Sequence, residues 1–157
     1  MDQLLNTSKL AQTLFDETYN CAQSVLKALN DVTGLDDHLT EAISAGFGGG
    51  MGKHQEICGA ITGASMAISH SVYKLYDDKA EGKEAASEAV KAFMIDFKRE
   101  MDHLRCIDLT QTDFSRPEEK EAFVEAGGRE KICMEAVCYA AQTAAKIIYD
   151  YKEAAKA

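Results

Sequence analysis

Residues 83–104 read KEAASEAVKAFMIDFKREMDHL, and this stretch decides the fold class. Its large apolar side chains recur every three or four residues, at Val90, Phe93, Met94, Phe97, Met101 and Leu104. Such spacing places them on one face of an α-helix, because 3.6 residues complete a turn. We predict an amphipathic helix from Lys83 to His103 that packs into a bundle.

The rest of the chain is helical in composition. It holds one proline and no tryptophan, and it is rich in residues that lose little side-chain entropy in a helix. Further helices are expected over residues 8–18, 20–31, 55–76, 117–125 and 129–153, with a short one after residue 36. The sequence predicts a single all-α domain over residues 1–157, a compact bundle of about five to seven helices with a glycine-rich loop before the central helix.

Charge and hydropathy exclude several classes of partner. The 17 basic residues are scattered among 26 acidic ones, for a net charge of −9, which disfavours nucleic acid. There is no secretory signal and no apolar run of about 18 residues, so we expect a cytoplasmic protein with no membrane partner. In that compartment cysteines are more often catalytic, redox-sensing or metal-bound than paired in structural disulfides.

Five cysteines are spread along the chain without a CxxC pair, at Cys21, Cys58, Cys106, Cys133 and Cys138. The absence of CxxC excludes a zinc ribbon and c-type haem attachment, so any joint site must be assembled by the fold. On the predicted last helix, Cys133 faces inward, and Cys138 is turned away from it by about 140°. Cys138 is therefore set apart from the other four.

The predicted helix starts suggest which thiols are reactive. Cys21 follows Asn20, a predicted N-cap, and Cys58 lies near the start of the central helix, where the helix dipole would lower the thiol pKa. Cys106 is expected in a loop, where it could move as a resolving partner. Alternatively, buried cysteines fill small gaps in a non-enzymatic helical interaction module, for which the face of Gly59 and Gly63 offers a homodimer contact.

Two other groups of residues are candidates for binding. Gly48, Gly49 and Gly50 lie in a glycine-rich loop whose backbone N–H groups could cradle a cofactor or an anion, or could simply allow a tight turn. His54 and His103 precede Cys58 and Cys106 by four and three residues. Each imidazole could serve as a ligand or a base, although a solvated histidine is the commoner case.

The order of these motifs resembles a known family. Tyr19-Asn20-Cys21-Ala22-Gln23, then Cys58-Gly59-Ala60-Ile61-Thr62-Gly63, then Cys106 and Cys133 are similar to the redox-active C_GCAxxG_C_C family, named for its cysteines. Ile57 stands where the name places a glycine before the second cysteine. The resemblance implies a small helical protein, found largely in anaerobic prokaryotes, that uses Cys21, Cys58, Cys106 and Cys133 in redox chemistry.

The resemblance leaves two chemistries open. One is thiol/disulfide exchange with a redox partner protein or a small-molecule thiol, with Cys58 as the first candidate for the reactive thiolate. The other is electron transfer through a metal-binding cage, in which Cys21, Cys58, Cys106 and Cys133, with His54 or His103, hold zinc or an iron–sulfur cluster.

Overall fold

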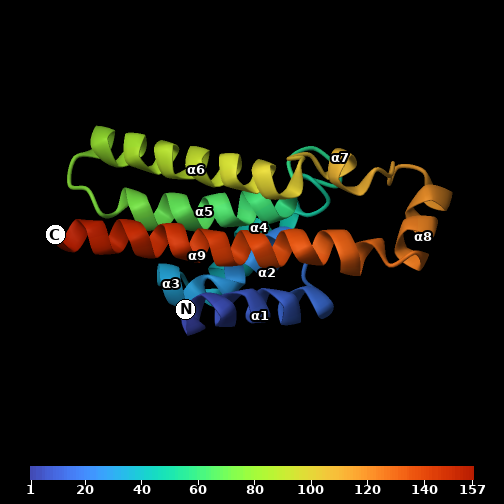
Figure 1. Cartoon of the computed structure of the whole chain (residues 1–157), viewed down its shortest axis with the longest axis horizontal. Coiled ribbons are helices and arrows are strands. Elements are labelled where there is room, and N and C mark those ends of the chain that lie inside the picture. Colours follow the sequence, from blue (N-terminus) through green and yellow to red (C-terminus); the bar gives the residue numbers. More distant parts are fainter.

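The computed structural model describes all residues from 1 to 157 and is all-α, as the sequence predicts (Figure 1). A 3₁₀ turn spans Ala45–Phe47, and a π-helical segment spans Arg129–Cys133. The α-helices are α1 (Asp2–Asp16), α2 (Cys21–Ala28), α3 (Asn30–Thr33), α4 (Asp37–Ser44), α5 (Gly59–Tyr73), α6 (Lys79–Met101), α7 (Cys106–Thr110), α8 (Pro117–Glu125) and α9 (Met134–Lys156). The nine helices exceed the expected five to seven because α3 and α7 are single short turns that carry no clear periodic pattern.

Three long helices form the centre of the bundle. In Figure 1, α5 lies between α6 and α9, and α1 and α2 lie beyond α9. The helix predicted from residue 83 is α6, and its Phe93 and Phe97 are fully buried. The inner face of α9 is rich in buried alanines, which allow neighbouring helices to approach closely. No helix combines the length and hydropathy of a membrane span.

The start of the central helix differs from the sequence-based expectation. α5 begins at Gly59 rather than near residue 55, because Ile57 forms an antiparallel bridge with Arg105 and residues 55–58 lie outside any helix. The Cys58 N–H donates to the Leu104 carbonyl at 2.9 Å, and the Cys106 N–H donates to the Glu56 carbonyl at 2.7 Å. Cys106 is therefore held by this bridge as the first residue of α7, and the expected mobile loop position for it is wrong.

Helices α2 and α5 approach each other closely at two glycines. A Cβ atom added at Gly63 would lie 2.5 Å from the Ala22 carbonyl oxygen, and one at Gly59 would lie 3.1 Å from the Cys21 Cβ atom. The Gly59 and Gly63 face is thus covered by α2 of the same chain. The expected use of that face for a homodimer is wrong, because α2 occupies it, and a homodimer as such stays a prediction.

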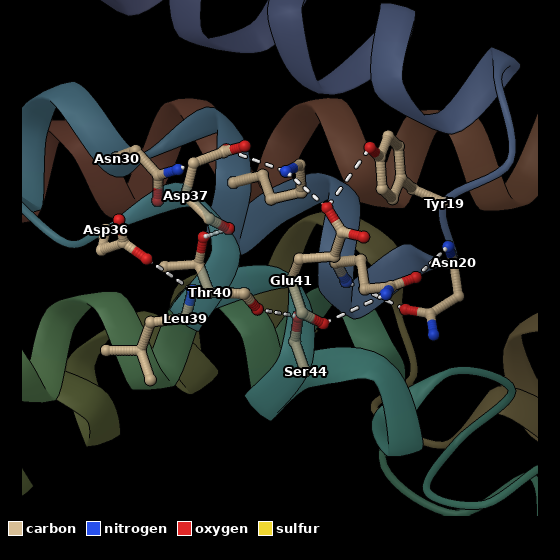
Figure 2. A network of polar contacts seen from close by, with 11 residues as sticks. Tyr19, Asn20, Asn30, Asp36, Asp37, Leu39, Thr40, Glu41 and Ser44 are labelled. Atoms are coloured by element: carbon tan, nitrogen blue, oxygen red, sulfur yellow. Dashed lines mark hydrogen bonds and ion pairs between the residues drawn. The ribbon is translucent and has the colours of Figure 1, made fainter.

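A polar network fixes the start of α2 (Figure 2). Asn20 and Gln23 form a reciprocal capping box, in which the Gln23 N–H donates to the Asn20 side chain and the Asn20 N–H donates to the Gln23 side chain. The two amide groups also reach the next segment, since Asn20 donates to the Ala45 carbonyl and Gln23 to the Glu41 carbonyl. These bonds hold Cys21, which lies between them, in a defined position.

Lys27 in the same network gives a stability test. Its side chain is 5% exposed, and its Nζ lies 2.8 Å from Asp37, 3.0 Å from Glu41 and 4.9 Å from the centre of the Tyr19 ring. Both carboxylates remain in contact with water, so Lys27→Met, which keeps the apolar stem, should lower the free energy of unfolding by only about 1 kcal/mol. Lys27→Ala should cost more because the stem is lost as well. Urea denaturation measures the free energy of unfolding of both variants. An equal decrease in the two would show that the apolar stem of Lys27 does not contribute to stability.

Candidate functional site

One small pocket brings four cysteines together. Its volume is about 20 Å³, which holds roughly one water-sized occupant. The lining residues come from five segments of the chain: Cys21, Gly49, Gly50, Cys58, Gly59, Cys106, Leu109, Thr110, Ile132, Cys133 and Ala136. All cysteines are free thiols, and no three His, Cys, Asp or Glu side chains surround a common point as metal ligands do.

Three of the four pocket cysteines stand at the start of a helix. Cys21 is the first residue of α2, Cys58 is the N-cap of α5, and Cys106 is the first residue of α7. Cys133 ends the π-helical segment that continues directly into α9. The sequence indicated a helix start for Cys21 and Cys58 only, because it placed Cys106 in a loop.

Burial dominates the acidity of these thiols. Desolvation raises the pKa of Cys58 to about 12 and that of Cys133 to about 11, and it also raises the pKa of Cys106. For Cys21, desolvation comes first and repulsion by the other three cysteines adds to it, so its pKa lies well above the ordinary value. The expected lowering of the Cys21 and Cys58 pKa is wrong, because the loss of water outweighs the helix N-terminus.

The four pocket cysteines differ in how far they are exposed. Cys58 and Cys106 are 7% and 8% exposed, whereas Cys21 and Cys133 are half-buried. Cys21 and Cys133 are thus the members that can meet a molecule from outside. Desolvation is the main cause of the raised pKa of both, and repulsion from three other cysteines adds to it at Cys21, but from Cys106 alone at Cys133.

Gln55 is a site residue that the sequence did not indicate. Its side chain is buried, and its backbone adopts a left-handed conformation with φ of 55°. Its Nε2 lies 3.9 Å from the Cys106 sulfur and donates to the Thr112 carbonyl at 2.9 Å, while its Oε1 accepts from the Phe114 N–H at 2.7 Å. The amide therefore ties the segment after α7 to the pocket and opposes the rise in the Cys106 pKa.

Arg129 supplies the positive charge nearest the pocket. It opens the π-helical segment that ends at Cys133, and its Nη2 donates to the Phe15 carbonyl at 2.6 Å while the guanidinium covers the Phe15 ring. Its charge favours the thiolates of Cys21 and Cys133, although burial outweighs it. π-helical turns occur frequently at functional sites, because they reposition side chains within a helix.

The glycine-rich loop forms one wall of the pocket. Gly49 and Gly50 line it with φ of 63° and 76°, and a Cβ atom at Gly50 would lie 2.7 Å from the Gln55 backbone. Only glycine fits there without strain. Gly48 packs against Asn20 outside the pocket. The loop closes on itself by backbone hydrogen bonds, so the glycines permit a tight turn; a role in cofactor binding stays a prediction.

Three other candidates lie outside the pocket. His54 and His103 are exposed and do not line it. The sulfur of Cys138 lies 3.8 Å from the Ser8 carbonyl oxygen, on the side of α9 that faces α1. The separation of Cys138 from the other cysteines matches the helical geometry expected from the sequence.

A family model matches residues 19–147 and is described as "Putative redox-active protein (C_GCAxxG_C_C)". The chain belongs to this family. The match includes all four pocket cysteines and the glycine-rich loop. A search of curated proteins and a search of solved structures each found no match. Membership in the C_GCAxxG_C_C family thus supports a redox role in general, and the mechanism has to come from the site itself.

Proposed function

We propose that this protein carries electrons by cycling its pocket cysteines between thiols and a disulfide. The observation that supports this is the convergence of four thiols, from four separate segments, on one pocket of about 20 Å³. Single cysteines that merely fill gaps have no reason to gather. The buried amide of Gln55 beside the Cys106 sulfur also distinguishes the pocket from apolar core.

The exchange involves two sulfur displacements. The thiolate of one pocket cysteine attacks a sulfur of a partner disulfide, forms a mixed disulfide, and releases one partner thiolate, which takes up a proton. A second pocket cysteine then loses its proton and attacks the first, which releases the other partner thiol. The pocket has lost two electrons and two protons, and the partner disulfide has gained them.

Burial assigns the roles within the pocket. We place the attack on Cys133, because it is half-buried and Arg129 lies nearby, whereas Cys58 is 7% exposed. The raised pKa values keep the thiols neutral near pH 7, so the free protein should react slowly with disulfides. A partner that brings a positive charge to the pocket would increase the thiolate fraction.

A thiolate metal centre is the second candidate, and the donor set favours it. Four cysteine sulfurs match the ligand number of a structural zinc or iron site, and the pocket volume suits a single ion better than a cluster. Cys21, Cys58, Cys106 and Cys133 would hold the ion, and iron would supply one-electron transfer. Such binding would require the side chains to turn toward a common point.

Oxidation of the purified protein tests the proposal. We expect anaerobically purified protein to show five free thiols on denaturation and to lose two or four of them after prolonged equilibration with oxidised glutathione, since the neutral thiols react slowly. Differential alkylation with mass spectrometry should place every new disulfide among Cys21, Cys58, Cys106 and Cys133. Cys138 is the internal control, because it lies outside the pocket and should stay alkylatable.

The other outcomes are equally informative. Stoichiometric zinc or iron in the anaerobic protein, with the four thiols protected from alkylation, would replace the disulfide proposal with the metal centre. If no metal is bound and Cys138 is oxidised as readily as the pocket cysteines, both proposals fail.

A further inference from the structure

A large apolar groove lies along α6 and the end of α5. It has a volume of about 660 Å³, and its apolar lining comes from Tyr73, Ala86, Val90, Met94, Ile95 and Leu104. Tyr73 is 43% exposed and Ile95 is 58% exposed. A second groove, of about 650 Å³, adjoins it through shared lining residues and extends the apolar surface to α4. Apolar surface this continuous on a soluble helix pair is typical of a site where another protein binds.

Three lysines rim the groove in a chain that is strongly acidic overall. Lys83, Lys91 and Lys98 all line it, although the net charge of the protein is −9. Lys91 lies 4.0 Å from Glu88 in an exposed pair, which is a weak interaction, and neither Lys83 nor Lys98 forms an ion pair within the chain. Their charges are free to meet carboxylates on a bound molecule.

The lysine spacing disfavours a second copy of the same chain as the occupant. Lys91 stands about midway along α6 between Lys83 and Lys98. Suppose that a copy packs antiparallel on this face, with the two-fold axis at the middle of the groove. Lys91 then meets Lys91 of the copy, and Lys83 meets Lys98 of the copy. Such pairing of like charges opposes self-association and selects an acidic partner.

The groove ends next to the cysteine pocket. Leu104 lines the groove, and its carbonyl accepts the hydrogen bond from the Cys58 N–H at 2.9 Å. Cys106 lies two residues further along the chain and is held by the same antiparallel bridge. A molecule seated in the groove therefore contacts the segment that positions two of the four pocket cysteines.

We propose that this groove is the docking site for an acidic amphipathic helix of a redox partner protein. The stretch from Lys83 to Lys98 is about 22 Å long at 1.5 Å per residue, which accommodates about four helical turns. Leucine-like side chains of the partner helix fill the groove, and its carboxylates meet the three lysines. The statement that the partner exchanges electrons rests on the proposed function; the binding of an acidic helix does not.

Peptide binding tests the surface directly. The probe is a fluorescent 15-residue amphipathic peptide with leucines on one face and glutamates on the other, measured by anisotropy against the full-length protein. A peptide with the same leucines and with lysines in place of the glutamates is the matched control. We expect the glutamate peptide to bind about tenfold more tightly or better, and this preference should shrink as salt is added.

Variants then locate the binding site. The double variant Lys91→Glu/Lys98→Glu should weaken binding of the glutamate peptide by about tenfold and strengthen binding of the lysine peptide. Lys146→Glu/Lys156→Glu makes the same change in net charge on exposed positions of α9 and should leave both affinities unchanged. Equal binding of the two peptides, or an equal effect of the two double variants, would overturn the proposal. A stable dimer whose association changes in Lys91→Glu/Lys98→Glu, and not in Lys146→Glu/Lys156→Glu, would assign the surface to a second copy instead.

Failure of the docking site can be told apart from failure of the proposed function. The peptide measurement needs no thiol chemistry and can be made with the cysteines fully reduced. The disulfide mapping described above needs no partner protein.

Discussion

Gly63→Ala is expected to lower the free energy of unfolding by about 2–4 kcal/mol, although alanine normally stabilises a helix relative to glycine by about 1 kcal/mol. The added Cβ atom would lie 2.5 Å from the Ala22 carbonyl oxygen and 3.2 Å from its Cα atom. These are backbone atoms of a buried helix, so they cannot move aside as a flexible side chain would. Helices α2 and α5 would have to separate.

Gly46→Ala is the matched control for this experiment. A Cβ atom at Gly46 would meet no atom within 4 Å, and its φ is outside the left-handed region. Its effect on unfolding should stay within about 0.5 kcal/mol. Urea denaturation followed by circular dichroism measures both variants, and a Gly63→Ala protein as stable as the natural one would refute the close approach of the two helices.

The same substitution should disturb the cysteine pocket. Cys21 begins α2, and Cys58 immediately precedes α5, so separation of the helices moves these two sulfurs apart. Disulfide mapping of Gly63→Ala should show less pairing between Cys21 and Cys58 than in the natural protein. Gly46→Ala should leave the pattern of disulfides unchanged.

Alkaline pH is expected to destabilise the reduced protein by several kcal/mol. The Cys58 pKa rises from 9.0 to about 12 on folding, and the Cys133 pKa rises to about 11. Above about pH 9 the unfolded chain loses thiol protons that the folded protein retains, so stability falls with rising pH until the folded pKa is reached. Below about pH 8 these thiols are neutral in both states and their contribution to stability is fully present.

Cys58→Ala isolates one thiol in this experiment. The Cys58 thiol has a pKa of 9.0 in the unfolded chain and of about 12 in the folded protein. For such a group, the free energy of unfolding falls by about 1.4 kcal/mol between about pH 7 and about pH 10. Urea denaturation of the reduced natural protein and of reduced Cys58→Ala, each at both pH values, measures this effect. The decrease in the free energy of unfolding should be smaller by that amount in Cys58→Ala. Lysine and tyrosine titrate in both proteins, so their contributions cancel in the comparison. An identical pH dependence would show that Cys58 is not desolvated in the folded state.

Much of the fold was accessible from local patterns. The spacing of Phe93 and Phe97 predicted that they face the core, and both are fully buried in α6. The helical wheel placed Cys138 away from Cys133, and the structure agrees. These predictions depend only on the 3.6-residue repeat of a helix, which acts within a few turns.

The failures all involve contacts between distant segments. Residues 55–58 look helical, but pairing of Ile57 with Arg105 keeps them out of the helix, and α5 begins only at Gly59. The same pairing places Cys106 at the start of α7 instead of in a loop. Gln55 carries no motif, and its role beside Cys106 comes from hydrogen bonds to residues more than fifty positions away.

The sequence by itself determined that the chain is an all-α protein and that four of its five cysteines belong together by family pattern and helical phase. Only the tertiary structure decided that these four line one pocket, that burial raises their pKa values, and that a lysine-rimmed groove ends beside them. The reason is physical. Helix formation and amphipathic phase depend on neighbours along the chain, whereas desolvation and the meeting of thiols depend on which segments exclude water from one another.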